Sequence, residues 1–232
     1  MADGRSERAK IRARTSARIL ALSLFAWLAY AWAQAPAPVS GDWPMPAKDH
    51  ASTRFADLAD LNRDNVARLA PAFTFDTGVR RGQEAAPIVV GATMYVVTPY
   101  PNVVYALDLA RPGAPVKWKY EPKPLAAAQG VACCDVVNRG ATYADGRLFI
   151  NTLDGQTIGL DAASGRELWR TKLGDVARGE SMTMAPFVVG DRVLVGNSGG
   201  EFGVRGWLVA LDAASGREAW RAYSTGPDRD VL

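Results

Sequence analysis

Short apolar segments separated by turn residues fill most of the chain after residue 87, and this pattern predicts β-strands rather than helices. The clearest stretch lies between residues 141 and 172. Pairs of turn-forming residues, Asp145-Gly146, Asp154-Gly155 and Ser164-Gly165, divide this stretch into four parts. We therefore predict four short antiparallel strands, at residues 141–143, 147–152, 156–161 and 167–172.

One stretch before residue 87 has the spacing of a helix. Leu58, Leu61, Val66 and Leu69 recur at roughly helical intervals between Asp57 and Leu69. We predict a helical or turn-rich segment there, the strongest such candidate in the part of the chain that follows the leader.

Tryptophans recur along the strand pattern at a constant spacing of 51 residues, as Trp118, Trp169 and Trp220. Nearly the same phrase precedes the last two, GLDAASGRELW at Gly159–Trp169 and ALDAASGREAW at Ala210–Trp220. A fixed period of this length indicates a repeat architecture, and four strands with one aromatic per repeat are typical of a propeller blade. The sequence predicts an all-β fold of about three four-stranded blades. We expect each tryptophan to pack between neighbouring blades; stacking on a ligand is the alternative.

Three blades are too few to close a ring, since propellers have about four to eight. The third repeat is followed closely by the last residues, Asp230-Val231-Leu232. We therefore expect residues 42–232 to be the N-terminal portion of a longer propeller, truncated here.

The first residues read as a targeting segment. Basic residues are followed by the uncharged apolar run Ile19–Ala33, and Ala31-Trp32-Ala33 offers a small-x-small cleavage site. We assign residues 1–33 to a signal peptide, with an uncleaved anchor as the alternative, and residues 34–41, rich in Pro and Ala, to a spacer. The expected location is the periplasm.

Removing this leader changes the charge of the protein. The whole chain carries +3, but the leader holds six of the 27 Lys and Arg residues and two of the 24 Asp and Glu residues. The remainder carries about −1, so the sequence gives no indication of nucleic-acid binding.

The repeat also predicts which polar residues converge. Aligned on the first strand of each unit, Pro87, Thr142 and Pro186 correspond, and three positions earlier lie Glu84, Arg139 and Thr183. One position in each blade faces one end of the central axis, so we expect these three side chains to form a polar ligand pocket. Chance occurrence of polar loop residues is the alternative.

The only two cysteines, Cys133 and Cys134, are adjacent and lie just before Arg139. A disulfide between them would close a strained eight-membered ring, because a trans peptide holds neighbouring Cα atoms at about 3.8 Å. Such strain is more often found at functional sites than in scaffolding, and export favours oxidation. Two buried free thiols are the alternative.

A second cluster is the glycine-rich stretch Asn197–Gly206, which contains Glu201 and Arg205. Glycine lets the backbone approach a ligand closely, and a carboxylate is a hard ligand for a cation such as Ca²⁺. The alternative is a hairpin turn with an exposed Glu201–Arg205 pair. His50, the single histidine, is expected at the surface rather than as a ligand. The sequence contains no Cys-x-x-Cys-His haem motif and no phosphate-binding loop.

At this point the residues resemble a known family, the pyrroloquinoline quinone (PQQ) dependent alcohol dehydrogenases, and most closely the periplasmic methanol dehydrogenases. The resemblance covers nearly all of residues 41–232. The phrases that carry it are Thr53-Arg54-Phe55, Phe73–Gly78, Arg81–Glu84, Ala132–Gly140, Met182–Pro186 and Gly199–Gly206. The adjacent cysteines followed by Asp-Val-Val-Asn-Arg-Gly are the most specific.

The resemblance implies an eight-bladed propeller and assigns roles to the residues found above. Cys133 and Cys134 would form a disulfide ring against one face of PQQ. The residues that match those surrounding the cofactor are Glu84, Arg139, Thr183, Ser198, Gly199 and Gly200. Glu201 matches a ligand of the active-site metal, which is Ca²⁺ or a lanthanide ion, and the Gly199–Gly206 stretch is more similar to the lanthanide-dependent branch.

The activity implied is oxidation of a primary alcohol, methanol above all, to the aldehyde, with electrons passed to a cytochrome c. By the same resemblance the catalytic base and the remaining metal ligands lie beyond Leu232, so no catalytic residue is assigned and we expect the chain to be inactive alone. A homodimer is left open for the full-length protein.

Two other readings remain at this stage. One is a non-catalytic propeller with the same repeat, an outer-membrane assembly scaffold, which needs neither cysteine pair nor pocket. The absence of a cysteine near Ala33 that could carry a lipid anchor speaks against it. The other is a PQQ enzyme for ethanol or larger alcohols.

Overall fold

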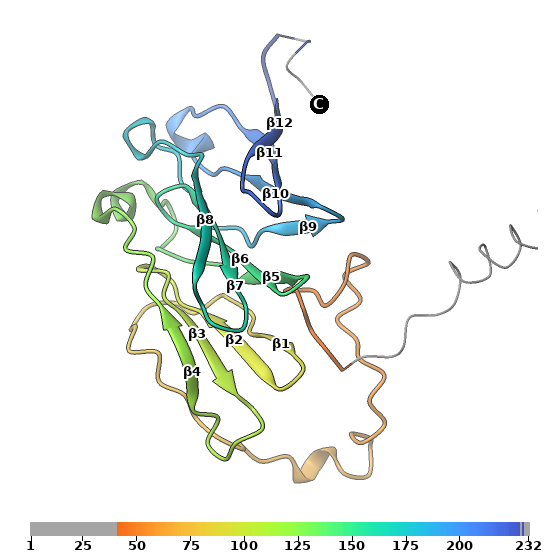
Figure 1. The fold of residues 1–232 in the computed structure, drawn as a ribbon. Coiled ribbons are helices and arrows are strands. Elements are labelled where there is room, and N and C mark those ends of the chain that lie inside the picture. The colour runs from red at the N-terminus through yellow and green to blue at the C-terminus, as the bar shows by residue number, and fades with distance from the viewer. Residues whose placement is uncertain (1–40, 228, 230–232) are drawn as a thin grey trace, which may run out of the picture. The chain divides into compact units, whose positions relative to one another are not determined.

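The computed structural model describes residues 41–227 and 229. The predicted signal peptide and all of the spacer except Gly41 lie outside the described residues. Within the described part, strands dominate and are arranged in three four-stranded antiparallel sheets (Figure 1). The prediction of an all-β fold with about three blades is confirmed.

Each sheet is a meander in which every strand pairs with its neighbours in sequence. The first blade contains β1 (Ile88–Val90), β2 (Thr93–Val97), β3 (Val104–Asp108) and β4 (Val116–Tyr120). The second contains β5 (Ala141–Ala144), β6 (Arg147–Thr152), β7 (Gln156–Asp161) and β8 (Glu167–Lys172). The third contains β9 (Phe187–Val189), β10 (Arg192–Gly196), β11 (Trp207–Asp212) and β12 (Glu218–Tyr223). Short 3₁₀ helices lie in the connections, η1 (Val66–Arg68), η2 (Ala126–Val131), η3 (Val176–Arg178) and η4 (Gly200–Phe202).

The strands of the second blade agree with the prediction, apart from one additional residue at the end of β5. This accuracy follows from the turns. Asp145 and Gly146 have φ angles of +47° and +74°, and Gly155 and Gly165 have +82° and +72°. These left-handed conformations favour Asp and Gly, so the sequence marks where each strand must stop.

The apolar core lies between blades rather than inside one sheet. β1 packs against β5, and β5 packs against β9, so the first strands of the three blades lie side by side. One buried cluster joins the first two blades, with Ile88, Val104 and Ile158 among its members. A second cluster joins the last two, around Phe149 and Val193. Packing of successive sheets face to face in this way is the arrangement of a propeller.

The repeated tryptophans fasten neighbouring blades together. The ring of Trp118 lies against Gly165 of the second blade, and the ring of Trp169 lies against Gly216 of the third. A Cβ on Gly165 or Gly216 would come within 2.6 Å or 2.4 Å of the ring. Each indole N–H also donates to a carbonyl of the next blade, at 3.1 Å in both cases. The predicted packing between neighbouring blades is confirmed for Trp118 and Trp169.

Trp220 holds the corresponding place in the third blade. It lies on β12, the last strand of the described residues, and it is 42% exposed. By contrast, only 9% of Trp169 is exposed, because the third blade covers its ring.

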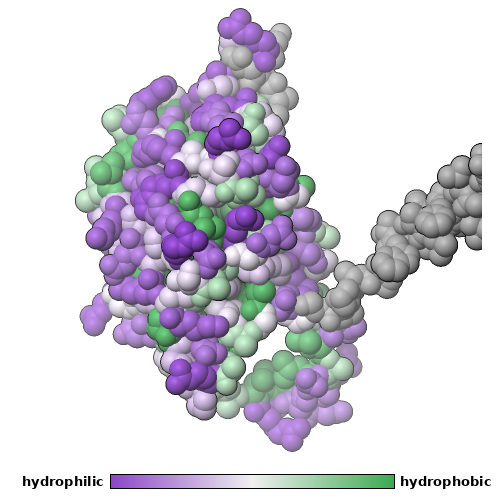
Figure 2. Space-filling model, in the orientation of Figure 1, coloured by the Kyte–Doolittle hydropathy of each residue, from purple (hydrophilic) through white to green (hydrophobic). Residues whose placement is uncertain are grey.

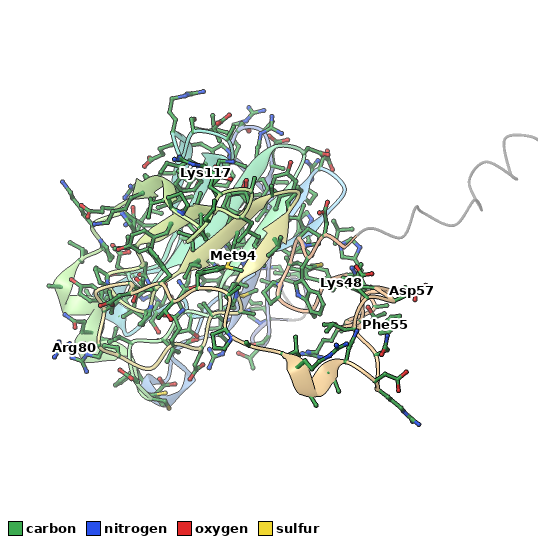
Figure 3. The ribbon with its side chains drawn as sticks, turned by 90° about the horizontal axis from the view of Figure 1, so that it is seen from below. Lys48, Phe55, Asp57, Arg80, Met94 and Lys117 are labelled. Carbon is green, nitrogen blue, oxygen red and sulfur yellow. The ribbon has the colours of Figure 1, made fainter. Side chains whose placement is uncertain are left out.

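The segment Asp57–Leu69, predicted to be helical or turn-rich, is turn-rich. The structure has only the three-residue η1 there, and the leucines and the valine of the pattern are all more than half exposed. Asn62 and Asn65 use their side-chain oxygens to accept backbone N–H groups nearby, which favours turns over a helix. Without a surface to cover, so short a helix is not stable in water. Figure 3 shows Phe55 and Asp57 at the margin of the molecule, away from the strands that surround Met94.

The surface in the orientation of Figure 1 is mainly polar, with small apolar areas between the charged groups (Figure 2). Among the described residues, no helix has the length and hydropathy needed to cross a bilayer.

The contact between Trp169 and Gly216 predicts an unequal response to the same substitution. Gly216 and Gly190 both have a left-handed φ, +70° and +56°, but a Cβ at Gly190 meets nothing within 4 Å. Gly216→Ala should therefore lower the free energy of unfolding by about 1–3 kcal/mol more than Gly190→Ala, because both share the backbone cost and only the first displaces the ring. Urea unfolding of the two variants measures this, and equal midpoints would show that the ring does not need glycine beneath it.

Candidate active site

A pocket of about 310 Å³ lies where loops of the second and third blades meet. It is formed by the cysteine loop, the residues before β5, the residues before β9 and the connection between β10 and β11. The lining includes these predicted site residues: Cys133, Cys134, Arg139, Thr183, Ser198, Gly199, Gly200 and Glu201. Only Glu84 of the predicted set is not part of the lining, and it contacts Arg139 from the first blade.

The cysteine loop is held in place from both sides. On the side before it, Ala128 of η2 is fully buried beside Leu153 and Val136. The backbone N–H of Leu125 donates to the buried carboxylate of Asp154 at 3.2 Å, which anchors the start of η2 to the second blade. On the side after it, the carbonyl of Val136 accepts from the N–H of Tyr100 at 2.9 Å.

The conformation of the loop depends on Asp135, which follows the cysteines. Asp135 has a φ of +88°, which is uncommon for a residue other than glycine. Its carboxylate accepts the N–H of Val136 at 2.7 Å and lies 3.8 Å from the guanidinium of Arg81. These contacts stabilise the turn that directs the two cysteine side chains toward the pocket.

Both cysteines are exposed free thiols in the structure, so the alternative of two buried thiols is wrong. Their sulfur atoms lie 2.6 Å apart, closer than two unbonded sulfurs normally approach. A disulfide between them stays a prediction. Hydrogen bonding to Cys134, partial loss of hydration and the nearby carboxylate of Glu201 raise the pKa of Cys133 to about 11. Glu201 is therefore close enough to the cysteine pair to act on its charge.

Arg139 joins the three blades at the edge of the pocket. Its Nη1 donates to the hydroxyl of Thr183 at 2.8 Å, and its Nη2 lies 3.2 Å from the carboxylate of Glu84. The Arg139 backbone N–H donates to the Thr183 carbonyl at 2.9 Å. The predicted convergence of these three side chains is present in the structure.

The repeat alignment behind that prediction is nevertheless one residue out in the second blade. Counted back from the hairpin turns that follow β1, β5 and β9, the corresponding residues are Glu84, Asn138 and Thr183. The side chain of Asn138 is fully buried, and Arg139, next in the chain, reaches the pocket. The alignment matched Thr142 to Pro87 and Pro186, whereas Ala141 is the residue at their position in the blade.

The glycine-rich stretch reaches the pocket through a short backbone pairing. Ser198 and Ser181 exchange N–H···O=C bonds at 3.2 Å and 2.8 Å, which fixes the start of the stretch beside the residues before β9. Gly199 follows with a φ of +130°, and a Cβ there would come within 2.4 Å of the Gly179 carbonyl. Only glycine fits, whereas at Gly200 nothing lies within 4 Å.

Glu201 is an exposed residue of η4, which lies within the hairpin connection between β10 and β11, and it lines the pocket. Arg205 places its guanidinium 3.9 Å from the centre of the Tyr223 ring. Among the described residues, no three or more His, Cys, Asp or Glu side chains are grouped so that they could hold a metal ion. Two carboxylates, those of Asp135 and Glu201, are among the residues that line the pocket.

A second cavity, of about 420 Å³, lies at the other ends of β5 and β9. It is lined by residues of the segment Pro44–His50 and by the hairpin ends that include Asp145 and Gly190. His50 is exposed, as predicted, and its Nε2 lies 2.7 Å from the carbonyl of Val188. No residue predicted to bind PQQ or metal lines this cavity.

The family to which these features point is decided by comparison with known proteins. The profile of a family described as "PQQ: Glucose/ethanol/alcohol dehydrogenase, beta-propeller domain" matches residues 43–230. The chain belongs to this family of PQQ-dependent dehydrogenases.

Relatives within the family cover the same part of the chain. A lanthanide-dependent methanol dehydrogenase of Methylacidiphilum fumariolicum is 55% identical over 192 residues, which are 83% of this chain and 31% of that protein. Subunit 1 of the methanol dehydrogenase [cytochrome c] of Methylorubrum extorquens is 46% identical over 197 residues, covering 82% and 31%. A solved europium-containing methanol dehydrogenase matches with a TM-score of 0.81 and 55% identity, over 83% of this chain and 33% of the other. The chain thus spans about a third of the length of these relatives.

Several residues that line the pocket were not predicted from the sequence. Ala132, Asp135, Val137 and Ser181 also line it. Asp135 stood within the quoted cysteine phrase and could have been suspected because it follows two adjacent cysteines. No local signal singled out Ser181, because its place depends on pairing with Ser198.

The proximity of Glu201 to Cys133 predicts an effect on thiol reactivity. In the chain reduced with dithiothreitol, Glu201→Gln should lower the pKa of Cys133 and speed its alkylation by iodoacetamide at pH 8, by up to about tenfold, because the thiolate is the reacting form. Mass spectrometry of the Cys133 peptide measures the rate. Asp145→Asn, at an exposed turn, removes a charge elsewhere and should leave the rate unchanged; equal rates in all three proteins would mean that Glu201 does not approach the thiol.

Proposed function

We propose that the chain forms one wall of the PQQ site of a quinoprotein alcohol dehydrogenase. The single observation that carries this proposal is the meeting of Glu84, Arg139 and Thr183, one residue from each blade, at the pocket that also contains the cysteine pair. A propeller with a purely structural role does not require an acid, a guanidinium and a hydroxyl to converge at its loops.

The donors present fit the chemistry of PQQ, a planar quinone that carries carboxylates. The Arg139 guanidinium has five N–H donors, and the contacts to Glu84 and Thr183 use only some of them. The remaining donors can bind a carboxylate, because two parallel N–H groups of a guanidinium match its two oxygens. The hydroxyl of Thr183 accepts from Arg139, so its own hydrogen remains available to an oxygen of the ligand. Ser198 and the glycines after it add a hydroxyl and backbone that a flat ring can approach closely. When bound, PQQ supplies a quinone that accepts two electrons.

The cysteine pair would provide the surface under the ring. Cys133 and Cys134 are exposed at the pocket, with their sulfurs directed toward each other. We propose that in the oxidising periplasm they form the disulfide ring implied by the family resemblance, and that this ring lies against one face of PQQ.

Glu201 is the proposed protein ligand of the metal in this chain. A hard carboxylate oxygen suits both Ca²⁺ and a lanthanide ion. Two relatives are named for lanthanide dependence or a europium ion, and for this reason we place a lanthanide before Ca²⁺. Further metal ligands and the catalytic base would come from outside the described residues, so we assign no catalytic residue here.

The proposed reaction is oxidation of a primary alcohol, with methanol as the first candidate, and a cytochrome c as electron acceptor. The names of the relatives support both choices. We propose a periplasmic location on the strength of the leader. Larger alcohols remain the alternative substrates, whereas the comparisons do not support an assembly scaffold.

Binding of PQQ to the purified chain tests the proposal. PQQ should quench tryptophan fluorescence in a saturable way, and Arg139→Gln should raise Kd by about tenfold or more, since a charge-assisted hydrogen bond contributes about 1.5–3 kcal/mol. The double variant Cys133→Ser/Cys134→Ser should also weaken binding.

Arg166→Gln is the matched control, because Arg166 lies in the turn before β8 and does not line the pocket. It should bind PQQ as the parent chain does. A chain that shows the circular dichroism of folded β-sheet and the cooperative unfolding of a packed core, yet does not bind PQQ, would contradict the proposal.

A further inference from the structure

The residues that lead into β9 are held in place by the second blade. Thr183 to Pro186 lie outside any sheet ladder, so their carbonyls depend on other donors. Three carbonyls of this short segment, those of Thr183, Met184 and Pro186, all accept hydrogen bonds from the second blade. The segment carries the Thr183 hydroxyl, and its position therefore depends on the donors behind it.

Asn151, on β6, supplies the central bond. Its side-chain Nδ2 donates to the Met184 carbonyl at 3.0 Å, and its Oδ1 accepts from Thr157 at 2.8 Å. Its own carbonyl accepts from the side chain of Asn138 at 2.9 Å, and the other end of that amide accepts the N–H of Gly140 at 2.8 Å. Both asparagines are fully buried.

One chain of hydrogen bonds thus runs from the Asn138 turn, through Asn151, to Met184. Its ends are the immediate neighbours of the two pocket residues, since Arg139 follows Asn138 and Thr183 precedes Met184. Buried polar chains of this kind are rigid, because a group that leaves its partner finds no water to replace it.

Thr142, on β5, supplies a second bond to the same segment. Its hydroxyl donates to the Pro186 carbonyl at 2.5 Å, and the residue is 2% exposed. Pro186 has no N–H of its own to fix it in a ladder, so this contact is a main restraint on the point where the segment enters β9.

We propose that Asn151 and Thr142 are positioning residues of the pocket, which set the distance between Arg139 and Thr183 without touching a ligand. The proposal rests on the proposed function for the identity of the ligand. Asn151 and Thr142 do not line the pocket, and neither belongs to the set that sequence reasoning assigned to it.

An outer contact provides a matched comparison. Thr171, on β8, donates its hydroxyl to the Gly216 carbonyl at 2.6 Å, which is also a bond from the second blade to the third. Thr142→Val and Thr171→Val therefore both remove a hydroxyl bond from the second blade to the third. Thr142, which lines the second cavity, bonds the segment that carries Thr183, whereas Thr171 lies at the Trp169 contact. A role limited to holding the blades together predicts the same result for both.

The first measurement compares Kd for PQQ in the two variants of the full chain. Thr142→Val should raise Kd by about fivefold or more, whereas Thr171→Val should leave it within about twofold. If both variants fold and bind PQQ equally well, or if Thr171→Val weakens binding as much as Thr142→Val, the proposal is overturned.

The second measurement needs no ligand and adds Asn151→Asp, which keeps the acceptor for Thr157 and loses the donor to Met184. The Arg139 amide, which donates to the Thr183 carbonyl, should exchange its hydrogen about tenfold faster in Thr142→Val and Asn151→Asp than in the parent chain and Thr171→Val. Unchanged exchange in folded Thr142→Val overturns the proposal even where Asn151→Asp fails to fold.

The two measurements also separate the inference from the proposed function. A folded parent chain that does not bind PQQ contradicts the proposed function, and hydrogen exchange at Arg139 then decides the inference alone. PQQ binding that is sensitive to Arg139→Gln but not to Thr142→Val or Asn151→Asp upholds the function and overturns the inference.

Discussion

The contact of an indole ring with a glycine of the next blade is the constraint on which the rest of the structure depends. Trp118 on Gly165 and Trp169 on Gly216 leave room for no side chain between them. The rings bring the sheets to a fixed separation, and the apolar clusters between the sheets are buried as a result. With the outer strands fastened in this way, β1, β5 and β9 come to lie side by side, and the loops that precede them meet.

The inner ends of the blades are joined by a different kind of interaction. On the outer strands, each blade contacts the next through an aromatic ring packed on a glycine. Around the pocket the blades are joined by polar groups, and Arg139 contacts both Glu84 and Thr183. Several backbone conformations there are ones that most residues avoid, at Asp135, Gly140 and Gly199. Strained or restricted backbone is tolerated where surrounding contacts fix it, and it clusters at functional sites. The tryptophan–glycine contacts of the outer strands thus support a polar inner edge, which we propose holds a ligand.

The sequence predicted the structure best where a local pattern is compatible with only one backbone conformation. The turns of the second blade need left-handed residues, so its strands could be bounded correctly, and the period of the tryptophans revealed the blades. For Asp57–Leu69 the pattern left a helix and a turn-rich segment both open, because spacing alone does not show whether a surface exists to cover the apolar side chains. Here these side chains are exposed and the segment is turn-rich. Asn151 and Thr142 could not have been found from the sequence, since their partners lie 33 and 44 residues away and the contacts exist only after the blades have packed.

The central claim is that loops of three blades build a wall that holds PQQ, and a crystal structure of the chain with PQQ tests it most directly. We predict a carboxylate of PQQ within hydrogen-bond distance of the Arg139 guanidinium and the Thr183 hydroxyl, with the quinone beside Cys133 and Cys134. The claim would be contradicted by PQQ bound in the larger cavity beside His50, or by a complex in which Arg139 and Thr183 make no contact with the ligand.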